Sequence, residues 1–275
     1  KEETTTYLSS VAAMEALKDS GITAEEIDLI LVATITGDYT TPSTACMVQA
    51  EIGAHNAVAF DIAGACAGFM FALHTAYAYM QTGMYKKVLV VGAETLSKIM
   101  DWQDRSTCVL FGDGAGAVVL ESDTVGLMAF DQGSDGVKGK VLTCLGRGNH
   151  NPLVKETESL GYVKMDGQEV YKFAVSTVPA SIQKVLSQAG IGTEDVDYYL
   201  LHQANIRILQ SVAKRLKVSE DKFPICLDHC GNMSAASVPV LLDEVNRKGM
   251  LKRGQKLILS GFGAGLTWGT ALLEW

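Results

Sequence analysis

Apolar residues recur along the chain in two patterns, one typical of helices and one typical of buried strands. Residues 11–21 (VAAMEALKDSG) and 180–190 (ASIQKVLSQAG) carry apolar side chains at three- and four-residue spacing, which predicts amphipathic helices. Residues 29–32 (LILV) and 88–91 (VLVV) are short continuous apolar runs, which predict buried strands. Residues 68–80 (GFMFALHTAYAYM) are apolar at most positions, as in a helix that is buried between two sheets.

The chain contains an internal repeat. Residues 20–32 (SGITAEEIDLILV) align with residues 189–201 (AGIGTEDVDYYLL) at a constant shift of 169 positions, and a helical pattern precedes both segments. The same shift superposes residues 88–92 (VLVVG) on residues 257–261 (LILSG). A repeat of this kind predicts two similar halves of alternating helices and strands.

A second match places the boundary between these halves. Residues 116–121 (GAVVLE) match residues 269–274 (GTALLE) at a different shift. We therefore expect an N-terminal half at residues 1–122 and a C-terminal half at residues 123–275, with helices layered between sheets. A site would form where the halves meet, near strand ends and helix starts.

The repeat also predicts which residues meet at that site. Cys66 lies opposite Ala235 in residues 232–239 (NMSAASVP), and both segments of small residues open a helix after a strand and a turn. If the halves pack face to face about a pseudo-two-fold axis, these helix starts approach each other. Cys66 and Asn232 are then expected to be neighbours.

Composition and charge narrow the class of function. The 275 residues are 48% hydrophobic and 20% charged, which suits a chain with a full apolar core. A formal charge of −8 disfavours nucleic-acid binding, which depends on neutralising phosphates. No apolar run reaches the roughly 18 residues that span a bilayer, and the opening KEETTTYL does not resemble a signal peptide. The six scattered cysteines are typical of reduced thiols in a cytoplasmic protein.

Cys66 is the first candidate for chemistry. Residues 61–69 (DIAGACAGF) surround it with glycine and alanine, which leaves room for a substrate and for close approach to backbone N–H groups. A free thiol with a pKa of about 8.5 is mostly protonated at neutral pH, but the unpaired N–H groups of a helix start favour the anion. We expect a lowered pKa and a Cys66 N–H that stabilises an oxyanion. The alternative is a small buried hydrophobic residue, which is the usual role of cysteine.

His202 and Asn232 are the other two candidates. In residues 199–205 (YLLHQAN) an apolar strand reaches a polar turn, and ligand sites of α/β folds collect at such strand ends. Asn232 lies in residues 229–237 (HCGNMSAAS), and its amide is no base, so a catalytic role would be hydrogen-bond donation. The alternatives are a structural histidine and an N-cap asparagine.

Two loops of small residues complete the pattern. Residues 261–269 (GFGAGLTWG) follow a strand, and residues 111–117 (FGDGAGA) are similar. Such loops either form turns or bring N–H groups against a ligand. A GxG pattern without a following lysine is only a weak indication of nucleotide binding.

Together these motifs resemble those of the thiolase superfamily, and specifically of its β-ketoacyl-acyl-carrier-protein synthase III family. That family has a cysteine in an ACAGF-type stretch, a histidine in HQAN and an asparagine in a GN-S-AAS-P stretch. This chain has ACAGF at residues 65–69, HQAN at 202–205 and GNMSAASVP at 231–239, in the same order. The resemblance implies an α/β thiolase-like fold of two pseudo-duplicated halves in a layered αβαβα arrangement, and a homodimer.

The resemblance also implies a reaction. Cys66 would take an acyl group from an acyl-coenzyme A (acyl-CoA), with the Cys66 and Ala264 N–H groups holding the oxyanion. Malonyl-acyl-carrier protein would then lose carbon dioxide while His202 and Asn232 donate to its thioester carbonyl, and the carbanion would attack the acyl-cysteine. This decarboxylating Claisen condensation initiates fatty acid synthesis, and we expect neither a cofactor nor a metal.

Further residues take roles from the same resemblance. Arg105 would sit at the mouth for the coenzyme A nucleotide, and Gly167 and Asn205 would line the pantetheine channel. Phe262 would press on the catalytic pair. Thr41 occupies a position from which a larger side chain often enters the acyl pocket of the partner subunit, and a small residue there favours a roomier pocket.

A basic helix is the last expected feature. Arg207, Lys214 and Arg215 share residues 205–218 (NIRILQSVAKRLKV), which predict one helix. A solvated face is the ordinary interpretation of such charges. In a net-acidic protein that docks an acidic carrier protein, they form a steering patch instead.

The sequence departs from the family at three points, and the small side chain of Thr41 is one of them. The family begins with a strand and a loop that bears a tryptophan and arginines for coenzyme A, and this sequence starts after them, so we expect a truncated N-terminal half. Ala264 stands where relatives often have glycine, which adds a methyl group to the loop while keeping the N–H.

The sequence leaves four alternatives to the synthase open. One is a cysteine hydrolase that uses Cys66 and His202, and another is a related condensing enzyme of secondary metabolism with a different acceptor. An inactive truncated fragment is the third. The fourth is a zinc-stabilised binding module around Cys226, His229 and Cys230, although this Cx3C spacing has no matching second pair.

Overall fold

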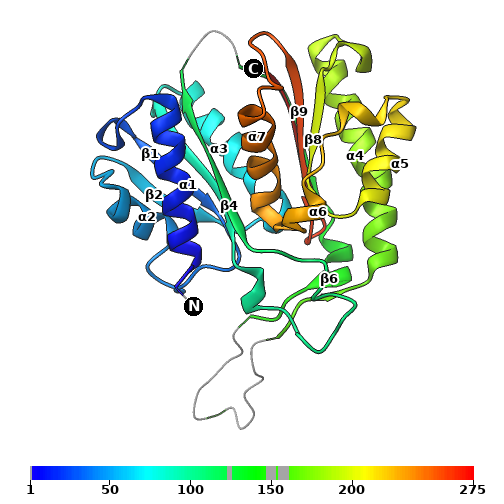
Figure 1. The fold of residues 1–275 in the computed structure, drawn as a ribbon, viewed down its shortest axis with the longest axis horizontal. Helices are drawn as coiled ribbons and strands as arrows, with labels where there is room; N and C mark the ends of the chain where they lie inside the picture. Colours follow the sequence, from blue (N-terminus) through cyan, green and yellow to red (C-terminus); the bar gives the residue numbers. More distant parts are fainter. Residues whose placement is uncertain (1, 123–125, 147–152, 154–160) are drawn as a thin grey trace.

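Two four-stranded sheets face each other across a pair of helices (Figure 1). The computed structural model describes residues 2–122, 126–146, 153 and 161–275. The first sheet has the strand order β2 (Val58–Ile62), β1 (Leu29–Ala33), β3 (Lys87–Glu94) and β4 (Gly114–Glu121). The second has the order β5 (Leu127–Ser134), β10 (Thr267–Glu274), β9 (Lys256–Gly263) and β8 (Tyr198–Leu201). A small ribbon forms from β6 (Leu142–Thr143) and β7 (Lys164–Met165).

The helices complete five layers. α3 (Gly68–Gln81) and α7 (Ser237–Arg247) lie between the sheets and contact both of them. α1 (Thr5–Ser20) and α2 (Thr44–Ile52) cover the outer side of the first sheet, and α4 (Gly167–Ala189) and α5 (Ile206–Leu216) cover that of the second. α6 (Leu227–Cys230) is a single turn before α7. The layers therefore have the αβαβα order that the family resemblance implies.

Alternating side chains of the buried strands fill separate cores. In β1, Leu29 and Leu31 join the core between the sheets, whereas Ile30 and Val32 join the core under α1 and α2. This period of two follows from the pleat of a strand, and it explains why the strand is apolar at every position. The central core is closed by apolar side chains of α3 and α7.

The internal repeat is a structural duplication. At the shift of 169 positions, β1 begins at Leu29 and β8 at Tyr198, and the 3₁₀ turns η2 (Ala65–Ala67) and η7 (Ser234–Ala236) coincide. Each half ends its first long helix at a left-handed glycine, Gly21 or Gly190, since glycine adopts that conformation without steric strain. The glycines and apolar runs that repeat in the sequence therefore form equivalent turns and equivalent strands in the two halves.

The predicted boundary lies between β4 and β5. β4 ends at Glu121 and β5 begins at Leu127, while residues 123–125 are outside the described part of the chain. We propose residue 122 as the division between the halves. The halves differ at one edge, because β10 pairs on both sides whereas its counterpart β4 pairs with β3 alone in the part of the chain that the structure describes.

A cavity of about 1620 Å³ lies along β4, between α1 and α7. The candidates Cys66, His202 and Asn232 do not line it, so it is separate from the predicted chemistry. None of the helices in the described ranges is both long and apolar enough to cross a membrane.

Strand glycines let the two halves meet. A Cβ atom at Gly92 of β3 would lie 2.4 Å from the carbonyl oxygen of Ala235, and one at Gly261 of β9 would lie 2.7 Å from the carbonyl oxygen of Cys66. The two contacts are related by the same shift of 169 positions. Each half therefore supplies the glycine against which the other half starts its central helix.

We expect the substitution Gly92→Ala to lower the free energy of unfolding by about 1–3 kcal/mol, because backbone atoms must move to admit the methyl group. Denaturant unfolding followed by circular dichroism measures this loss. Gly136→Ala is the matched control, since nothing lies within 4 Å of a Cβ there. Equal losses in the two variants would contradict the packing argument.

Candidate active site

Cys66 lies in the turn that starts α3, at the carboxyl end of β2. The preceding Ala65 has φ 43°, a left-handed conformation that is unusual for alanine, and the same conformation recurs at its repeat counterpart Ser234 with φ 48°. Both residues open a 3₁₀ turn directly before a central helix. The strained turn sets the direction of the Cys66 side chain at the junction of the halves.

The open surroundings predicted for Cys66 are wrong. The side chain is only 8% exposed. The space that Gly64 and Ala67 leave is filled from the other half, because a Cβ at Gly263 of β9 would lie 2.8 Å from the Cys66 Sγ. Glycine at position 263 therefore leaves the sulfur just enough room, and the backbone of β9 forms a wall of the site.

The predicted lowering of the Cys66 pKa is also wrong for this closed site. Burial raises the pKa of the thiol to about 11, and the nearby charge of Glu94 acts in the same direction. Hydrogen bonds from Ser234 and from the N–H groups of Cys66 and Ala264 oppose that rise. The helix start does favour the thiolate, as expected, but the loss of hydration outweighs it.

The backbone after β9 packs closely on the sulfur, because a Cβ at Gly263 would lie 2.8 Å from Cys66 Sγ. Two backbone N–H groups, those of Cys66 and of Ala264 in the other half of the chain, favour the thiolate and so act to lower the Cys66 pKa. Such a pair is suited to hold negative charge that develops on an oxygen bonded next to sulfur. The methyl group that Ala264 carries does not remove this N–H.

His202 follows β8 and is 1% exposed. Its N–H donates to the Ser260 carbonyl at 2.7 Å, which places His202 beside Gly261, the residue that packs against Cys66. The imidazole meets the Phe262 ring edge-on, with centroids 5.3 Å apart at an angle of 77°. The sequence-predicted contact of Phe262 with the histidine is therefore present.

Burial keeps the His202 imidazole neutral. It lowers the pKa of this side chain from 6.5 to about 3. The Nδ1 atom is buried and has no hydrogen-bond partner in the described residues. A neutral ring with its proton on Nε2 donates one hydrogen bond from that atom.

Asn232 is fixed by its backbone and by one side-chain oxygen. Its N–H donates to the Leu110 carbonyl at 2.9 Å, and its own carbonyl accepts from the Gly112 N–H at 3.0 Å. The Oδ1 atom accepts from the Ser234 N–H at 2.9 Å, which is an Asx turn. The N-cap of the following turn is Met233, so the N-cap alternative for Asn232 is wrong. The bond to Ser234 occupies the oxygen and directs the amide group, so the donor Nδ2 remains available for another acceptor.

Sequence reasoning missed two residues beside Cys66. Glu94, the last residue of β3, is fully buried and accepts hydrogen bonds from Thr36 Oγ1 at 2.6 Å and from Ser234 Oγ at 3.1 Å. Ser234 also contacts the Cys66 thiol, so a chain of polar groups connects the carboxyl group to the sulfur. A carboxylate that ends an apolar strand is the signal that could have revealed Glu94, because buried acids are rare.

The residues assigned to substrate binding lie on the surface. Arg105 is exposed in the turns before β4, Thr41 is exposed in the loop before α2, and Gly167 is the exposed first residue of α4. Asn205 is the N-cap of α5, where its Oδ1 accepts from the Arg207 N–H at 2.8 Å. The described contacts do not join these residues to Cys66, His202 or Asn232.

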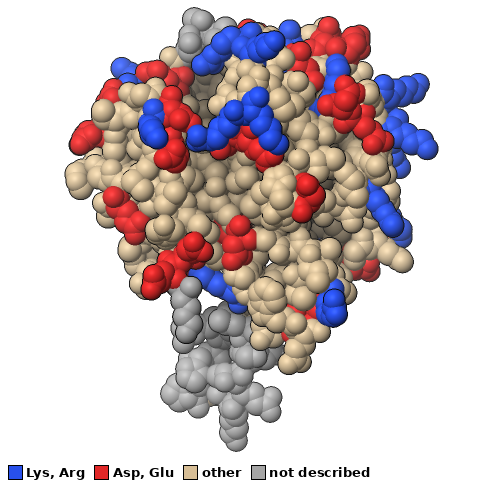
Figure 2. All heavy atoms as spheres, viewed as in Figure 1, with Lys and Arg blue, Asp and Glu red and all other residues tan. Residues whose placement is uncertain are grey.

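The three basic residues of α5 are exposed as expected. Arg207, Lys214 and Arg215 lie within 4 Å of no carboxylate in the described ranges. Figure 2 shows Lys and Arg side chains along the edge of the molecule where Figure 1 places α5. Their charge is therefore free to act on a partner.

Two family profiles match the chain. "3-Oxoacyl-[acyl-carrier-protein (ACP)] synthase III" matches residues 60–136, and "3-Oxoacyl-[acyl-carrier-protein (ACP)] synthase III C terminal" matches residues 186–275. These segments contain Cys66 and the pair His202 and Asn232 respectively.

Individual relatives cover nearly the whole chain. The Beta-ketoacyl-[acyl-carrier-protein] synthase III of Clostridium acetobutylicum is 51% identical over 275 residues, which cover 99% of this chain and 85% of the relative. The protein of the same name from Clostridium novyi is 52% identical over 277 residues and covers 100% and 86% respectively.

Solved structures have the same fold. The 3-oxoacyl-[acyl-carrier-protein] synthase III of Aquifex aeolicus VF5 has a TM-score of 0.92 and 42% identity, and the match covers 100% of this chain and 86% of that one. The priming beta-ketosynthase of the R1128 polyketide biosynthetic pathway has a TM-score of 0.91 and 35% identity, with 99% and 82% covered.

The buried carboxyl group gives a test of the site in the absence of substrate. Burial raises the Glu94 pKa from 4.5 to about 7. The folded chain thus binds a proton that the unfolded chain releases, so the stability from this group is complete below pH 4.5 and is lost as the pH rises through 7. Between pH 4.5 and pH 8, we expect the free energy of unfolding of the parent to fall by about 3 kcal/mol relative to Glu94→Gln.

Urea unfolding of both proteins across this range measures the difference. The titration of His202 is common to the two proteins and cancels in the comparison. If the free energies of unfolding of the two proteins changed in parallel with pH, the pKa of Glu94 would not differ between the folded and unfolded chain.

Proposed function

Because the chain belongs to the 3-oxoacyl-[acyl-carrier-protein] synthase III family, we propose that Cys66, His202 and Asn232 are its catalytic residues. The chain has the thiolase-like α/β fold of that family. It is an acyltransferase, and its condensing reaction initiates fatty acid synthesis from an acyl-CoA and malonyl-acyl-carrier protein. The residue roles below are our proposals for how this chain performs that reaction.

In the first half-reaction, Cys66 Sγ attacks the thioester carbonyl of the acyl-CoA. A bond forms between sulfur and the acyl carbon, the bond to the coenzyme A sulfur breaks, and the thiol proton leaves with coenzyme A. The N–H groups of Cys66 and Ala264 hold the oxyanion. The observation that carries this proposal is the close packing of the backbone next to Ala264 on the sulfur, since a Cβ at Gly263 would lie 2.8 Å from Sγ.

The raised pKa of the Cys66 thiol is compatible with this step. A protonated sulfur is stable in the closed site, and the charge appears only when an acyl carbonyl is present to receive it. At that moment the two N–H groups are already in place, so little reorganisation is required. The same desolvation that suppresses the free thiolate strengthens those hydrogen bonds.

In the second half-reaction, malonyl-acyl-carrier protein loses carbon dioxide, and its α-carbon attacks the acyl group on Cys66. A carbon–carbon bond forms, the bond between the acyl carbon and the Cys66 sulfur breaks, and the released thiolate takes a proton from water. Neutral His202 donates from Nε2, and Asn232 donates from Nδ2, to the thioester oxygen that gains charge in the enolate. Support comes from the pKa of His202 near 3, which makes the neutral donor dominant at neutral pH. Asn232 is supported by the Ser234 N–H, which occupies its Oδ1.

The proposal also assigns substrate-binding roles to residues on the surface. Arg105 binds the coenzyme A nucleotide, and Gly167 and Asn205 line the pantetheine channel. Phe262 holds the His202 ring from the edge. Thr41, which is exposed, stands where a larger side chain would enter the acyl pocket of the partner subunit in a homodimer, and its small side chain leaves that pocket roomier. A cytoplasmic location is supported by the cysteines, all of which are free.

The basic face of α5 docks the acidic carrier protein. Arg207, Lys214 and Arg215 are exposed and unpaired with carboxylates among the described residues, on a chain of net charge −8. A local positive patch on such a chain raises the encounter rate with an acidic partner, and salt weakens this effect.

One alternative has a specific observation in its favour. The priming ketosynthase of the R1128 polyketide pathway shares the fold at 35% identity. A condensing enzyme of secondary metabolism would use the same residues with a different acceptor. Assays with carrier proteins of fatty acid synthesis and of polyketide synthesis, at equal concentration, distinguish the two.

Intact-protein mass spectrometry tests the nucleophile. After incubation with acetyl-, isobutyryl- or octanoyl-coenzyme A, we expect one acyl increment on the parent and none on Cys66→Ala. Cys46→Ala is the matched control, since Cys46 is an exposed thiol on α2, and it should acylate normally. An increment that persists in Cys66→Ala would refute the assignment. The coenzyme A thioester that gives the highest yield of acyl-enzyme indicates which acyl group the pocket prefers.

Charge reversal tests the docking face. For Lys214→Glu and Arg207→Glu, we expect KM for malonyl-acyl-carrier protein to rise about 10-fold at low salt, while acyl transfer from acyl-CoA to Cys66 is unchanged. Lys252→Glu is the control, because Lys252 is exposed before β9, at the end of that strand opposite to Ala264. An equal rise in KM for the control would show a general charge effect.

A further inference from the structure

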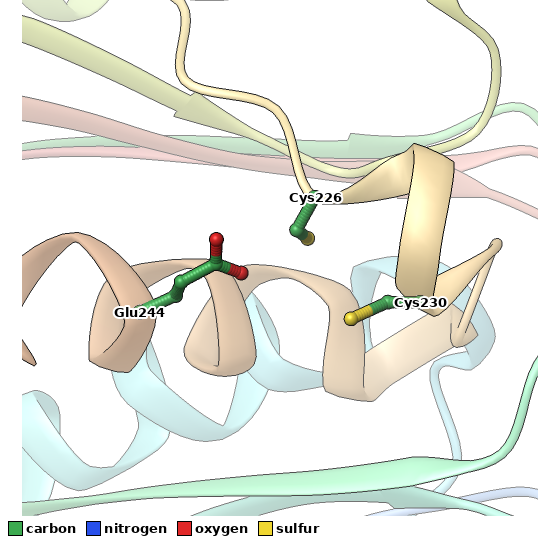
Figure 3. A group of neighbouring side chains, drawn as sticks. All are labelled: Cys226, Cys230 and Glu244. Atoms are coloured by element: carbon green, nitrogen blue, oxygen red, sulfur yellow. The ribbon is translucent and has the colours of Figure 1, made fainter. Parts of the chain in front are cut away.

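Three potential metal ligands converge next to the turn that holds Asn232. Cys226 immediately precedes α6, Cys230 ends it, and Glu244 lies on α7 (Figure 3). Their ligand atoms all lie within 4.8 Å of one another. Figure 3 shows the two thiols and the carboxylate pointing into one common space between the helices.

The backbone fixes this arrangement. Cys226 and Cys230 are separated by one helical turn, and the Cys230 N–H donates to the Cys226 carbonyl at 2.9 Å, so both thiols project from the same side. Cys226 is completely buried, while Cys230 and Glu244 are partly buried. Both cysteines are free thiols. Water therefore has limited access to the space between the sulfur atoms.

Each oxygen of the Glu244 carboxylate has a hydrogen-bonding partner. His229 Nε2 lies 3.0 Å from a Glu244 oxygen, and His229 Nδ1 lies 2.9 Å from an Asp228 oxygen. Lys248 also donates to Glu244. Groups of this kind orient a carboxylate ligand in metal sites. His229 itself is not a direct ligand, because its two ring nitrogens are hydrogen-bonded to Asp228 and Glu244.

We propose that Cys226, Cys230 and Glu244 bind one Zn²⁺ ion, with a water molecule as the fourth ligand. Two Zn–S bonds and one Zn–O bond form, and the two thiol protons are released to solvent. Bond lengths of about 2.3 Å to sulfur and about 2.0 Å to oxygen place tetrahedral ligands roughly 3.5 Å apart, so the side chains close by about 1 Å. Thiolate ligands select Zn²⁺ over Mg²⁺ and Ca²⁺.

This site revises the sequence-based expectation that the chain holds no metal. The Cx3C spacing has no second cysteine pair in the sequence, but α7 supplies the third ligand from a distance of fourteen residues along the chain. The ion links α6 to α7. Because only Gly231 separates Cys230 from Asn232, that link restrains the turn that carries the asparagine.

The experiment is a titration of the full, reduced chain with Zn²⁺ alone in competition with a chromophoric chelator. We expect one Zn²⁺ per chain, and at least a 10-fold lower affinity in Cys230→Ser and in Glu244→Gln. Cys46→Ser, which changes an exposed thiol on α2, is the matched control and should bind like the parent. Zn²⁺ should also raise the melting temperature of the parent and of the control, but not of the two site variants.

A second measurement needs no variant. Co²⁺ added to the reduced parent should give the thiolate-to-metal charge-transfer absorption of a site with two sulfur ligands. The absence of stoichiometric Zn²⁺ binding, or equal affinity in the parent and both site variants, would overturn the proposal. So would Co²⁺ binding without a thiolate band.

Discussion

The close approach of two backbones is the constraint on which the rest of the structure depends. Gly92 and Gly261 are equivalent residues of the central strands β3 and β9, and each packs against the carbonyl of a residue that starts the opposite central helix. With a side chain at either position, the halves could not pack at this distance. The result is a junction at which residues from both halves reach the same sulfur atom.

Desolvation is the common property of the groups at that junction. It keeps the thiol of Cys66 and the imidazole of His202 neutral, and it raises the pKa of Glu94 to about 7. The site therefore holds few full charges but several oriented dipoles, including the Ala264 N–H and the Asn232 amide. A site of this type stabilises charge that a substrate brings or develops, without having to displace a resident ion.

Much of the fold could be predicted, because the sequence repeats the same turns and strands at one constant shift. The meeting of the helix starts followed from that symmetry, and Ser234 does contact Cys66. The burial of Cys66 could not be predicted, because the wall formed by Gly263 comes from almost two hundred residues away in the chain. Glu244 was missed for the same reason, because tertiary packing supplies its partners and no local pattern marks it. Glu94 does carry a local signal, a carboxylate at the end of an apolar strand, but its partners Thr36 and Ser234 come from other parts of the chain.

The different exposure of the cysteines has a consequence for covalent inhibitors and labelling reagents. Cys46 and Cys144 are exposed, whereas Cys66 is buried and protonated. A reagent that responds only to accessible thiol will modify the exposed cysteines first and leave the reactive centre intact. Selective modification of Cys66 thus depends on recognition, with an electrophile delivered by a group that resembles the acyl-CoA substrate.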